Sequence, residues 1–276
     1  MGKDLKAENL TISLPNVGCN KNCPYCVSRM TGYMESDYWL MSRNIKKVRK
    51  TAEAAEVTSV LFTSKGETLL SFDELKEFAN EFRDFPLELQ TNGLLLDESI
   101  LNALCVIGMN VIAISIDSIE QLHMCMPIVR GITSRGMIPR ATLNLVGIDC
   151  PSGLLCYTPT QLIENCADLG FRQVTFRRIV CPENPKHQAT VEWIEKNIPS
   201  VICDRFIGEL DLAISYGKVV RILNSGMGIW DIGGVSVMYS KYCVQERDCG
   251  NDLRSLIFQE DGHLYTSWNS NASVLF

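Results

Sequence analysis

Three cysteines lie close together near the amino terminus of the sequence. Cys19, Cys23 and Cys26 fall within the segment Gly-Cys-Asn-Lys-Asn-Cys-Pro-Tyr-Cys, just after a short apolar run. Thiolates at such short spacing select soft metals, chiefly zinc or the iron of an iron–sulfur cluster. These three residues are therefore the candidate metal ligands and the candidate centre of any catalysis.

The number of ligands separates the two kinds of metal site. A closed structural zinc site has four protein ligands, and neither a histidine nor a fourth cysteine lies near this loop. The three histidines of the chain, His123, His187 and His263, all lie far downstream. A cubane cluster held by three thiolates leaves one iron free to bind a reactant. The spacing thus favours an open iron–sulfur cluster over structural zinc.

The composition is that of a globular protein with thiols rather than a disulfide framework. The chain has 276 residues, 46% of them hydrophobic, which is enough for one large core. Its charged start and its lack of a long apolar segment lead us to expect a cytoplasmic protein. A net charge of −6 argues against binding to long nucleic acids. Cysteines in helix-like contexts, such as Cys105, Cys125 and Cys166, are expected to be small buried hydrophobic residues.

Extended apolar segments alternate with helical ones through the first 180 residues. This alternation, with short connections, is typical of a parallel sheet with right-handed crossovers. The expected strands are 10–14, 57–63, 87–91, 111–116, 138–146 and 173–180. The expected helices between them are 36–55, 71–84, 97–107, 119–134 and 159–169. Six such strands are compatible with an open doubly wound sheet or with an incomplete barrel.

The alternation of side chains along the strands favours the barrel. A parallel sheet buried on both faces is almost continuously hydrophobic, but here one face of several strands is polar. The polar faces comprise Glu88, Gln90 and Asn92; Ser115 and Asp117; Arg140, Thr142 and Asn144; and Gln173, Thr175 and Arg177. We interpret them as the lumen of a barrel that holds a polar cofactor; strand ends that meet solvent are the alternative.

The expected fold is therefore α/β, a partial (β/α)6 TIM-like barrel with a small α+β extension at its carboxyl end. We expect the barrel over residues 1–180 and the extension over residues 181–276, where it covers the barrel mouth. In the extension, Glu260-Asp261-Gly262 lies between two apolar runs and predicts a hairpin turn.

The cysteine loop, with Tyr25 before its last cysteine, resembles that of the radical S-adenosylmethionine (SAM) superfamily. The resemblance implies a [4Fe–4S] cluster whose free iron binds SAM. One electron then cleaves SAM to methionine and a 5′-deoxyadenosyl radical, which abstracts hydrogen from a substrate. It also implies an electron donor such as flavodoxin or ferredoxin.

Further segments resemble this superfamily in the expected order along the chain. Gly66-Glu67-Thr68 is similar to the segment that receives the SAM amino group, although Lys65 and Thr68 replace its first glycine and its proline. The resemblance implies that SAM is bound by Tyr25, Gly66, Glu67, Thr68, Asn92, Ser115 and Asp117. Arg140 and Asn144 on the fifth strand are candidates for binding the SAM carboxylate and ribose, because a guanidinium binds a carboxylate through two hydrogen bonds. Of the remaining charged residues, Lys65 and Arg177 are candidate substrate contacts, and a simple salt bridge is the alternative for Arg177.

The carboxyl-terminal segment is similar to the auxiliary-cluster hairpin of the molybdenum-cofactor cyclase and peptide-maturase branches. It contains Cys243 and Cys249, but Ser267 stands where that hairpin usually has its next cysteine. We expect a degenerate hairpin, at 243–268, that has kept the fold and lost the metal. A second cluster held by Cys243, Cys249 and a distant ligand such as Cys181 is the alternative.

The resemblance leaves several functions open. A radical enzyme acting on a small-molecule or nucleotide-derived substrate ranks first, followed by a maturase that modifies a short peptide and by an activating enzyme for a partner protein. A structural metal-binding module without catalysis is the non-enzymatic alternative, supported by the altered residues Lys65 and Thr68.

Overall fold

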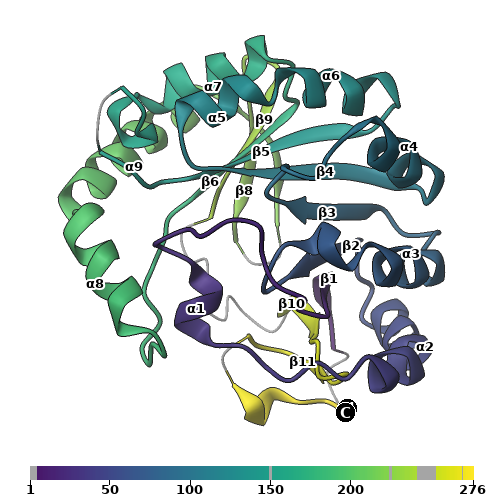
Figure 1. Cartoon of the computed structure of the whole chain (residues 1–276). Helices are drawn as coiled ribbons and strands as arrows, with labels where there is room; N and C mark the ends of the chain where they lie inside the picture. Colours follow the sequence, from purple (N-terminus) through teal and green to yellow (C-terminus); the bar gives the residue numbers. More distant parts are fainter. Residues whose placement is uncertain (1–4, 149–150, 224–225, 241–252, 269) are drawn as a thin grey trace.

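One curved sheet organises the protein (Figure 1). The computed structural model describes residues 5–148, 151–223, 226–240, 253–268 and 270–276. Its strands are β1 (Ala7–Leu14), β2 (Ser59–Ser64), β3 (Leu87–Thr91), β4 (Met109–Ile116), β5 (Ile138–Asn144), β6 (Gln173–Arg177), β7 (Lys218–Ile222), β8 (Gly228–Ile232), β9 (Val235–Ser240), β10 (Leu253–Phe258) and β11 (Leu264–Tyr265).

The strand order is β11-β10-β1-β2-β3-β4-β5-β6-β9-β8-β7. All neighbouring pairs from β10 to β9 are parallel, whereas β11 is antiparallel to β10 and β8 is antiparallel to both β9 and β7. The six predicted barrel strands are confirmed as β1 to β6, and the partial barrel is confirmed with them.

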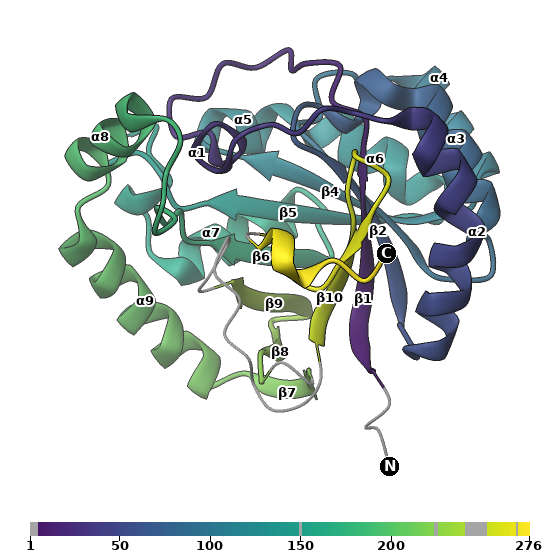
Figure 2. The same cartoon turned by 90° about the horizontal axis from the view of Figure 1, so that it is seen from below.

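Helices cover the outer face of the sheet, except that the helix after the cysteine loop lies on its inner side (Figures 1 and 2). They are α1 (Val27–Thr31), α2 (Tyr38–Ala54), α3 (Phe72–Glu81), α4 (Glu98–Val106), α5 (Ile119–Met124), α6 (Met126–Ser134), α7 (Pro159–Asp168), α8 (Gln188–Asn197) and α9 (Ser200–Ser215), with short 3-10 turns at Thr68–Ser71, Leu154–Cys156 and Asn271–Ser273. Among the described residues, no helix is long and apolar enough to cross a membrane.

Sequence periodicity explains how these elements pack. In α2, Met41, Ile45 and Val48 recur at helical spacing and are buried against the sheet. Along β1, Leu10 and Ile12 are fully buried beneath the helices, while the alternate residue Thr11 lines the lumen. The predicted polar lumen follows directly from this alternation.

Two local expectations were wrong. The predicted helix 119–134 is two helices that meet at Cys125, because Pro127 in the first turn of α6 has no backbone N–H with which to continue α5. Cys105 is exposed, whereas Cys125 and Cys166 are buried as expected. Near the end of an amphipathic helix, a small error in the predicted helical phase moves a residue from the buried face to the exposed one.

The residues after 180 contribute strands to both edges of the same sheet. β9 pairs in parallel with β6, and β10 pairs in parallel with β1. The predicted hairpin turn is confirmed between β10 and β11, where Gly262 has a φ of 79°. The carboxyl-terminal segment thus extends the barrel wall.

Candidate functional site

The three cysteines lie on the loop between β1 and α1, beside the carboxyl ends of the strands. Cys19 is exposed, and Cys23 and Cys26 are half-buried. All three line a cavity of about 210 Å³ together with Asn92, Ser115, Asp117 and Asn144, which stand at or just beyond the ends of β3, β4 and β5. The structure therefore brings together residues that are widely separated in sequence.

The donor set of this loop fits an iron–sulfur cluster. Among the described residues, no three histidine, cysteine, aspartate or glutamate side chains are close enough together to hold a single metal ion. A cubane does not require such convergence, because each thiolate binds a different iron atom. Burial raises the pKa of the Cys23 thiol, as does Asp117, while Lys21 lowers it. A bound metal would stabilise the thiolate form.

The loop is held from one side by the predicted SAM-binding segment. The backbone N–H of Glu67 donates to the Gly18 carbonyl at 2.9 Å. A Cβ atom on Gly66 would lie 1.9 Å from that carbonyl oxygen and 2.5 Å from Asn16 Oδ1, so no larger side chain fits there. Gly18 itself has a φ of 117°, a conformation that favours glycine. Gly66 therefore sets the distance between β2 and the cysteine loop.

A second contact holds the loop from the carboxyl-terminal hairpin. Glu260 is fully buried, and its carboxylate accepts hydrogen bonds from the backbone N–H groups of Asn16 (3.1 Å) and Met34 (3.2 Å) and from the Ser36 hydroxyl (3.3 Å). These partners flank the three cysteines on both sides in sequence. One carboxylate therefore fixes both ends of the cysteine loop.

The Glu67 carboxylate is satisfied within the protein. It accepts from Leu69 N (3.0 Å), Thr91 Oγ1 (2.6 Å) and Asn92 N (2.8 Å). Glu67 and its neighbour Thr68 are both buried at the wall of the cavity. This carboxylate ties the end of β3 to the segment after β2.

Other polar groups around the cavity lack partners. The Asn144 Nδ2 donates to Asp117 Oδ1 at 2.8 Å, but Asn144 Oδ1 is buried and has no hydrogen bond within the described part of the chain. The buried Tyr25 hydroxyl likewise has no hydrogen bond to any described residue. An unsatisfied buried polar atom costs about 1–3 kcal/mol. A polar ligand in this cavity would supply the missing partners.

Two charged groups of this cavity, Lys21 and Asp117, are paired with each other. Lys21 Nζ lies 2.5 Å from Asp117 Oδ2, and both side chains are largely shielded from solvent. Burial lowers the pKa of Lys21, but the Asp117 carboxylate outweighs this effect and holds the pKa above its usual value. Asn92 Nδ2 donates to Asn20 Oδ1 at 2.6 Å, which attaches the end of β3 to the cysteine loop.

Arg140 lies outside this cavity, contrary to its predicted role as a SAM ligand. Its guanidinium pairs with Glu88 at 2.6 Å and donates to Gln173 Oε1 at 2.7 Å. Arg140 precedes Asn144 by four residues on β5, about 13 Å along the strand. It therefore faces the lumen as expected but at a deeper level, where its charge is already compensated, and we do not propose it as a ligand.

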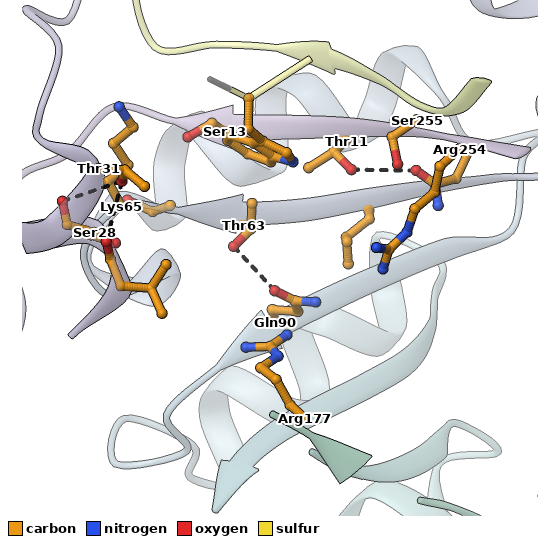
Figure 3. A pocket seen from close by; sticks show the side chains of 15 residues that line it. Thr11, Ser13, Ser28, Thr31, Thr63, Lys65, Gln90, Arg177, Arg254 and Ser255 are labelled. Carbon is orange, nitrogen blue, oxygen red and sulfur yellow. Dashed lines mark hydrogen bonds between the residues drawn. The ribbon is translucent and has the colours of Figure 1, made fainter. Parts of the chain in front are cut away.

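A second cavity, of about 250 Å³, occupies the lumen beside the first (Figure 3). Its lining includes Thr11, Ser13, Thr63 and Gln90 from β1, β2 and β3. Lys65 and Arg177, the two predicted substrate contacts, line both cavities. The two cavities are consequently adjacent, and a group bound in one has access to the other.

Several residues of this second cavity were not predicted from the sequence. Arg254 and Ser255 reach the lumen from β10, and Trp268 follows the terminal hairpin. Gln90 was predicted to face the lumen, and Ser13 shares the same polar alternation along its own strand, which was the signal available for it. No sequence signal placed Arg254 and Trp268 in the cavity, because their position depends on the pairing of β10 with β1.

The predicted auxiliary-cluster residues Cys243 and Cys249 lie outside the described residues. Cys181 is half-buried, and burial raises the pKa of its thiol. Ser267 and Trp268 line a groove at the mouth of the barrel with Lys65. A degenerate hairpin without a second cluster stays a prediction.

Comparison with known proteins identifies related sequences and folds. The radical SAM superfamily profile matches residues 13–149. An uncharacterized protein of Methanocaldococcus jannaschii is 31% identical over 105 residues, and the GTP 3′,8-cyclase of Clostridium acetobutylicum is 28% identical over 106 residues. Each match covers 37% of this chain and 32% of the relative, so the likeness is confined to about a third of those proteins.

Solved structures extend the likeness in fold to nearly the whole chain. Streptococcus suis SuiB, bound to its precursor peptide SuiA, superposes with a TM-score of 0.57 at 10% identity, over 96% of this chain and 61% of that one. The coproporphyrinogen III oxidase HemN of Escherichia coli gives a TM-score of 0.51 at 12% identity, over 78% and 53%. With the cysteine loop, the polar strand ends around it and the matched profile, we conclude that this chain belongs to the radical SAM superfamily.

Proposed function

We propose that the protein cleaves SAM reductively at a [4Fe–4S] cluster held by Cys19, Cys23 and Cys26, and that the resulting radical abstracts hydrogen from a small molecule in the lumen. The observation that supports this most is the shared wall of the two cavities, one lined by the three thiols and the other by polar lumen residues. When bound, the cluster and SAM supply one-electron cleavage of a carbon–sulfur bond, giving methionine and the hydrogen-abstracting radical.

The chain's own residues would bind and orient SAM in the first cavity. Asn144 Oδ1 and the Tyr25 hydroxyl are unpartnered there, and Ser115 lines the same wall. The close approach of Gly66 to the loop leaves backbone groups available to the polar end of methionine. Asp117, held by Lys21 and Asn144, is fixed in position for a ribose hydroxyl.

Water must be excluded from such a site because a reactive radical would otherwise be lost to side reactions. The Tyr25 ring packs against Trp193 of α8, with ring centroids 5.9 Å apart. This contact places α8 over α1 and shields one side of the cysteine loop. The chain thereby provides a cover that does not depend on the cofactors.

A small substrate is favoured over a peptide by the size of the lumen cavity, about 250 Å³. Pockets for drug-sized ligands span roughly 300–1,000 Å³, so this one suits a compact molecule. SuiB carries a bound peptide in a longer chain, and a peptide-modifying role here is the second candidate. The electron would come from a donor such as flavodoxin or ferredoxin.

The first prediction concerns formation of 5′-deoxyadenosine by the anaerobically reconstituted protein with dithionite and SAM. We expect the wild type to form it and Cys23→Ala to form none, because the variant lacks a cluster ligand. Cys105→Ala is the matched control, since Cys105 is exposed on α4 and should leave both cluster and product unchanged.

Either of two results would contradict the proposal. Product formation by Cys23→Ala at the wild-type rate would exclude this thiol as a ligand. A wild type with a full complement of iron and sulfide that binds SAM but never cleaves it would favour a metal-binding module without catalysis.

A further inference from the structure

The lumen cavity differs in charge from the rest of the protein. The whole chain carries a net charge of −6. Yet the described residues that line this cavity include Lys65, Arg177 and Arg254 and no aspartate or glutamate (Figure 3). A cationic cavity in an acidic protein has a locally positive electrostatic potential, which favours an anionic ligand.

Arg177 is a cation of this cavity that no described residue compensates. Its guanidinium, in Figure 3 directed toward Gln90, has no hydrogen bond or ion pair to any residue in the described part of the chain. Arg254 does have a partner within the protein. Because a guanidinium is weakly hydrated and binds carboxylate or phosphate through two parallel hydrogen bonds, Arg177 is suited to a planar or tetrahedral anion.

Lys65 adds a second positive charge to the lining of the same cavity. Its Nζ donates to the Gly32 carbonyl at 2.9 Å, a contact that orients the ammonium without neutralising it. Burial lowers the pKa of Lys65 and Lys186 adds to this, while Glu260 and Asp261 oppose it. Glu260 is already satisfied by the cysteine loop, so an anion in the cavity would bring Lys65 a new partner.

Ser13 provides an independent sign of a bound ligand. It is 0% exposed, lines the cavity, and its hydroxyl has no hydrogen bond among the described residues. Opposite it in the sheet, Thr63 donates to Gln90 at 3.3 Å, which leaves further hydroxyl and amide capacity toward the lumen. Hydroxyl groups on a ligand would satisfy these atoms.

We propose that the substrate is a small hydroxylated organic anion, whose carboxylate or phosphate binds Arg177 with the support of Lys65 while its hydroxyl groups bind Ser13 and Gln90. This inference rests on the proposed function, since it names the molecule from which hydrogen is taken. The unpaired guanidinium and the unpartnered serine both line the cavity beside the cysteines, so one ligand accounts for both.

The test uses the reconstituted protein with SAM at saturating concentration, so that SAM fills its own cavity and the added probes report on binding in the lumen. Two pairs of probes, ribose 5-phosphate with ribose and gluconate with glucitol, are titrated by calorimetry. We expect the charged member of at least one pair to bind about tenfold or more tightly than its neutral partner. The pair that shows the preference identifies phosphate or carboxylate as the anion.

Variants then assign the preference to Arg177. Arg177→Gln should bring the charged and neutral members to nearly equal affinity, and Arg177→Lys should restore part of the difference. Arg83→Gln removes an exposed arginine outside the cavity and should keep the full preference. Thermal unfolding of each variant checks that the fold is intact, which is expected because the substitution leaves no partner of Arg177 unsatisfied among the described residues.

The outcomes separate this inference from the proposed function. Equal binding within both pairs, or binding of neither member, overturns the anionic substrate. A preference that survives in Arg177→Gln while SAM affinity falls would assign Arg177 to SAM and also overturn it. Formation of 5′-deoxyadenosine is measured on the same preparations: its absence beside an intact anion preference would overturn the proposed function alone.

Discussion

Single residues in this protein have roles that follow from distances rather than from residue type. Gly66 is the sharpest case, because a Cβ atom there would lie 1.9 Å from the Gly18 carbonyl oxygen. We predict that Gly66→Ala displaces the cysteine loop, lowers the free energy of unfolding by about 1–3 kcal/mol, and reduces the iron bound after reconstitution. Iron and sulfide content per chain, together with urea unfolding, measures both effects.

Gly208 is the control for that substitution. It lies in α9, is exposed, and has nothing within 4 Å of an added Cβ atom, so Gly208→Ala should retain full iron content and gain about 0.5–1 kcal/mol from helix propensity. Equal iron content in the two alanine variants would mean that the loop accommodates the methyl group, and the positioning role of Gly66 would have to be abandoned.

At the scale of elements, the carboxyl-terminal hairpin holds the cysteine loop through Glu260. All three partners of the Glu260 carboxylate are hydrogen-bond donors. In Glu260→Gln, the side-chain NH2 group would therefore face an N–H or O–H donor instead of an acceptor. We predict that the variant loses its reconstituted cluster several-fold faster in air, at temperatures well below unfolding, and is less stable by about 1–3 kcal/mol. Decay of the visible absorbance against time measures cluster loss.

Glu192→Gln removes a comparable charge from the exposed face of α8 and should leave the rate of decay at the wild-type value. If both variants lose the cluster at the same rate, the contacts of Glu260 serve the fold only and do not protect the cluster.

Elements also show what the sequence can predict and what it cannot. Strands β1 to β6 were predicted because alternating strand and helix patterns are local, and the cysteines because their spacing is short. Arg140 was assigned to the correct face but the wrong depth, since a period of two defines a face and not a height along the barrel. Glu260 was read only as part of a turn, because its partners lie more than two hundred residues away.

The whole molecule is built so that the two ends of the chain depend on one another. β10 pairs in parallel with β1, and β9 pairs in parallel with β6, so residues after 180 complete a sheet that residues before 180 begin. Parallel pairing between segments so far apart leaves no local signature in sequence, so these two strand pairings were not among the expectations. The same pairing raises the free energy needed to unfold either segment while the other stays folded.

We therefore predict that the chain unfolds in a single transition, despite the division at residue 180 suggested by its sequence. Phe258 of β10 is fully buried opposite Ile12 of β1, and Phe258→Ala should lower the stability of the entire protein by about 3–5 kcal/mol. Unfolding in urea is followed by circular dichroism, which senses all helices, and by tryptophan fluorescence. The fluorescence senses α2, α8 and β8 through Trp39, Trp193 and Trp230, and the segment after β11 through Trp268; the two curves should coincide before and after the substitution. Two separated transitions, with only one of them shifted by Phe258→Ala, would mean instead that the barrel is stable without the strands that its carboxyl-terminal segment adds.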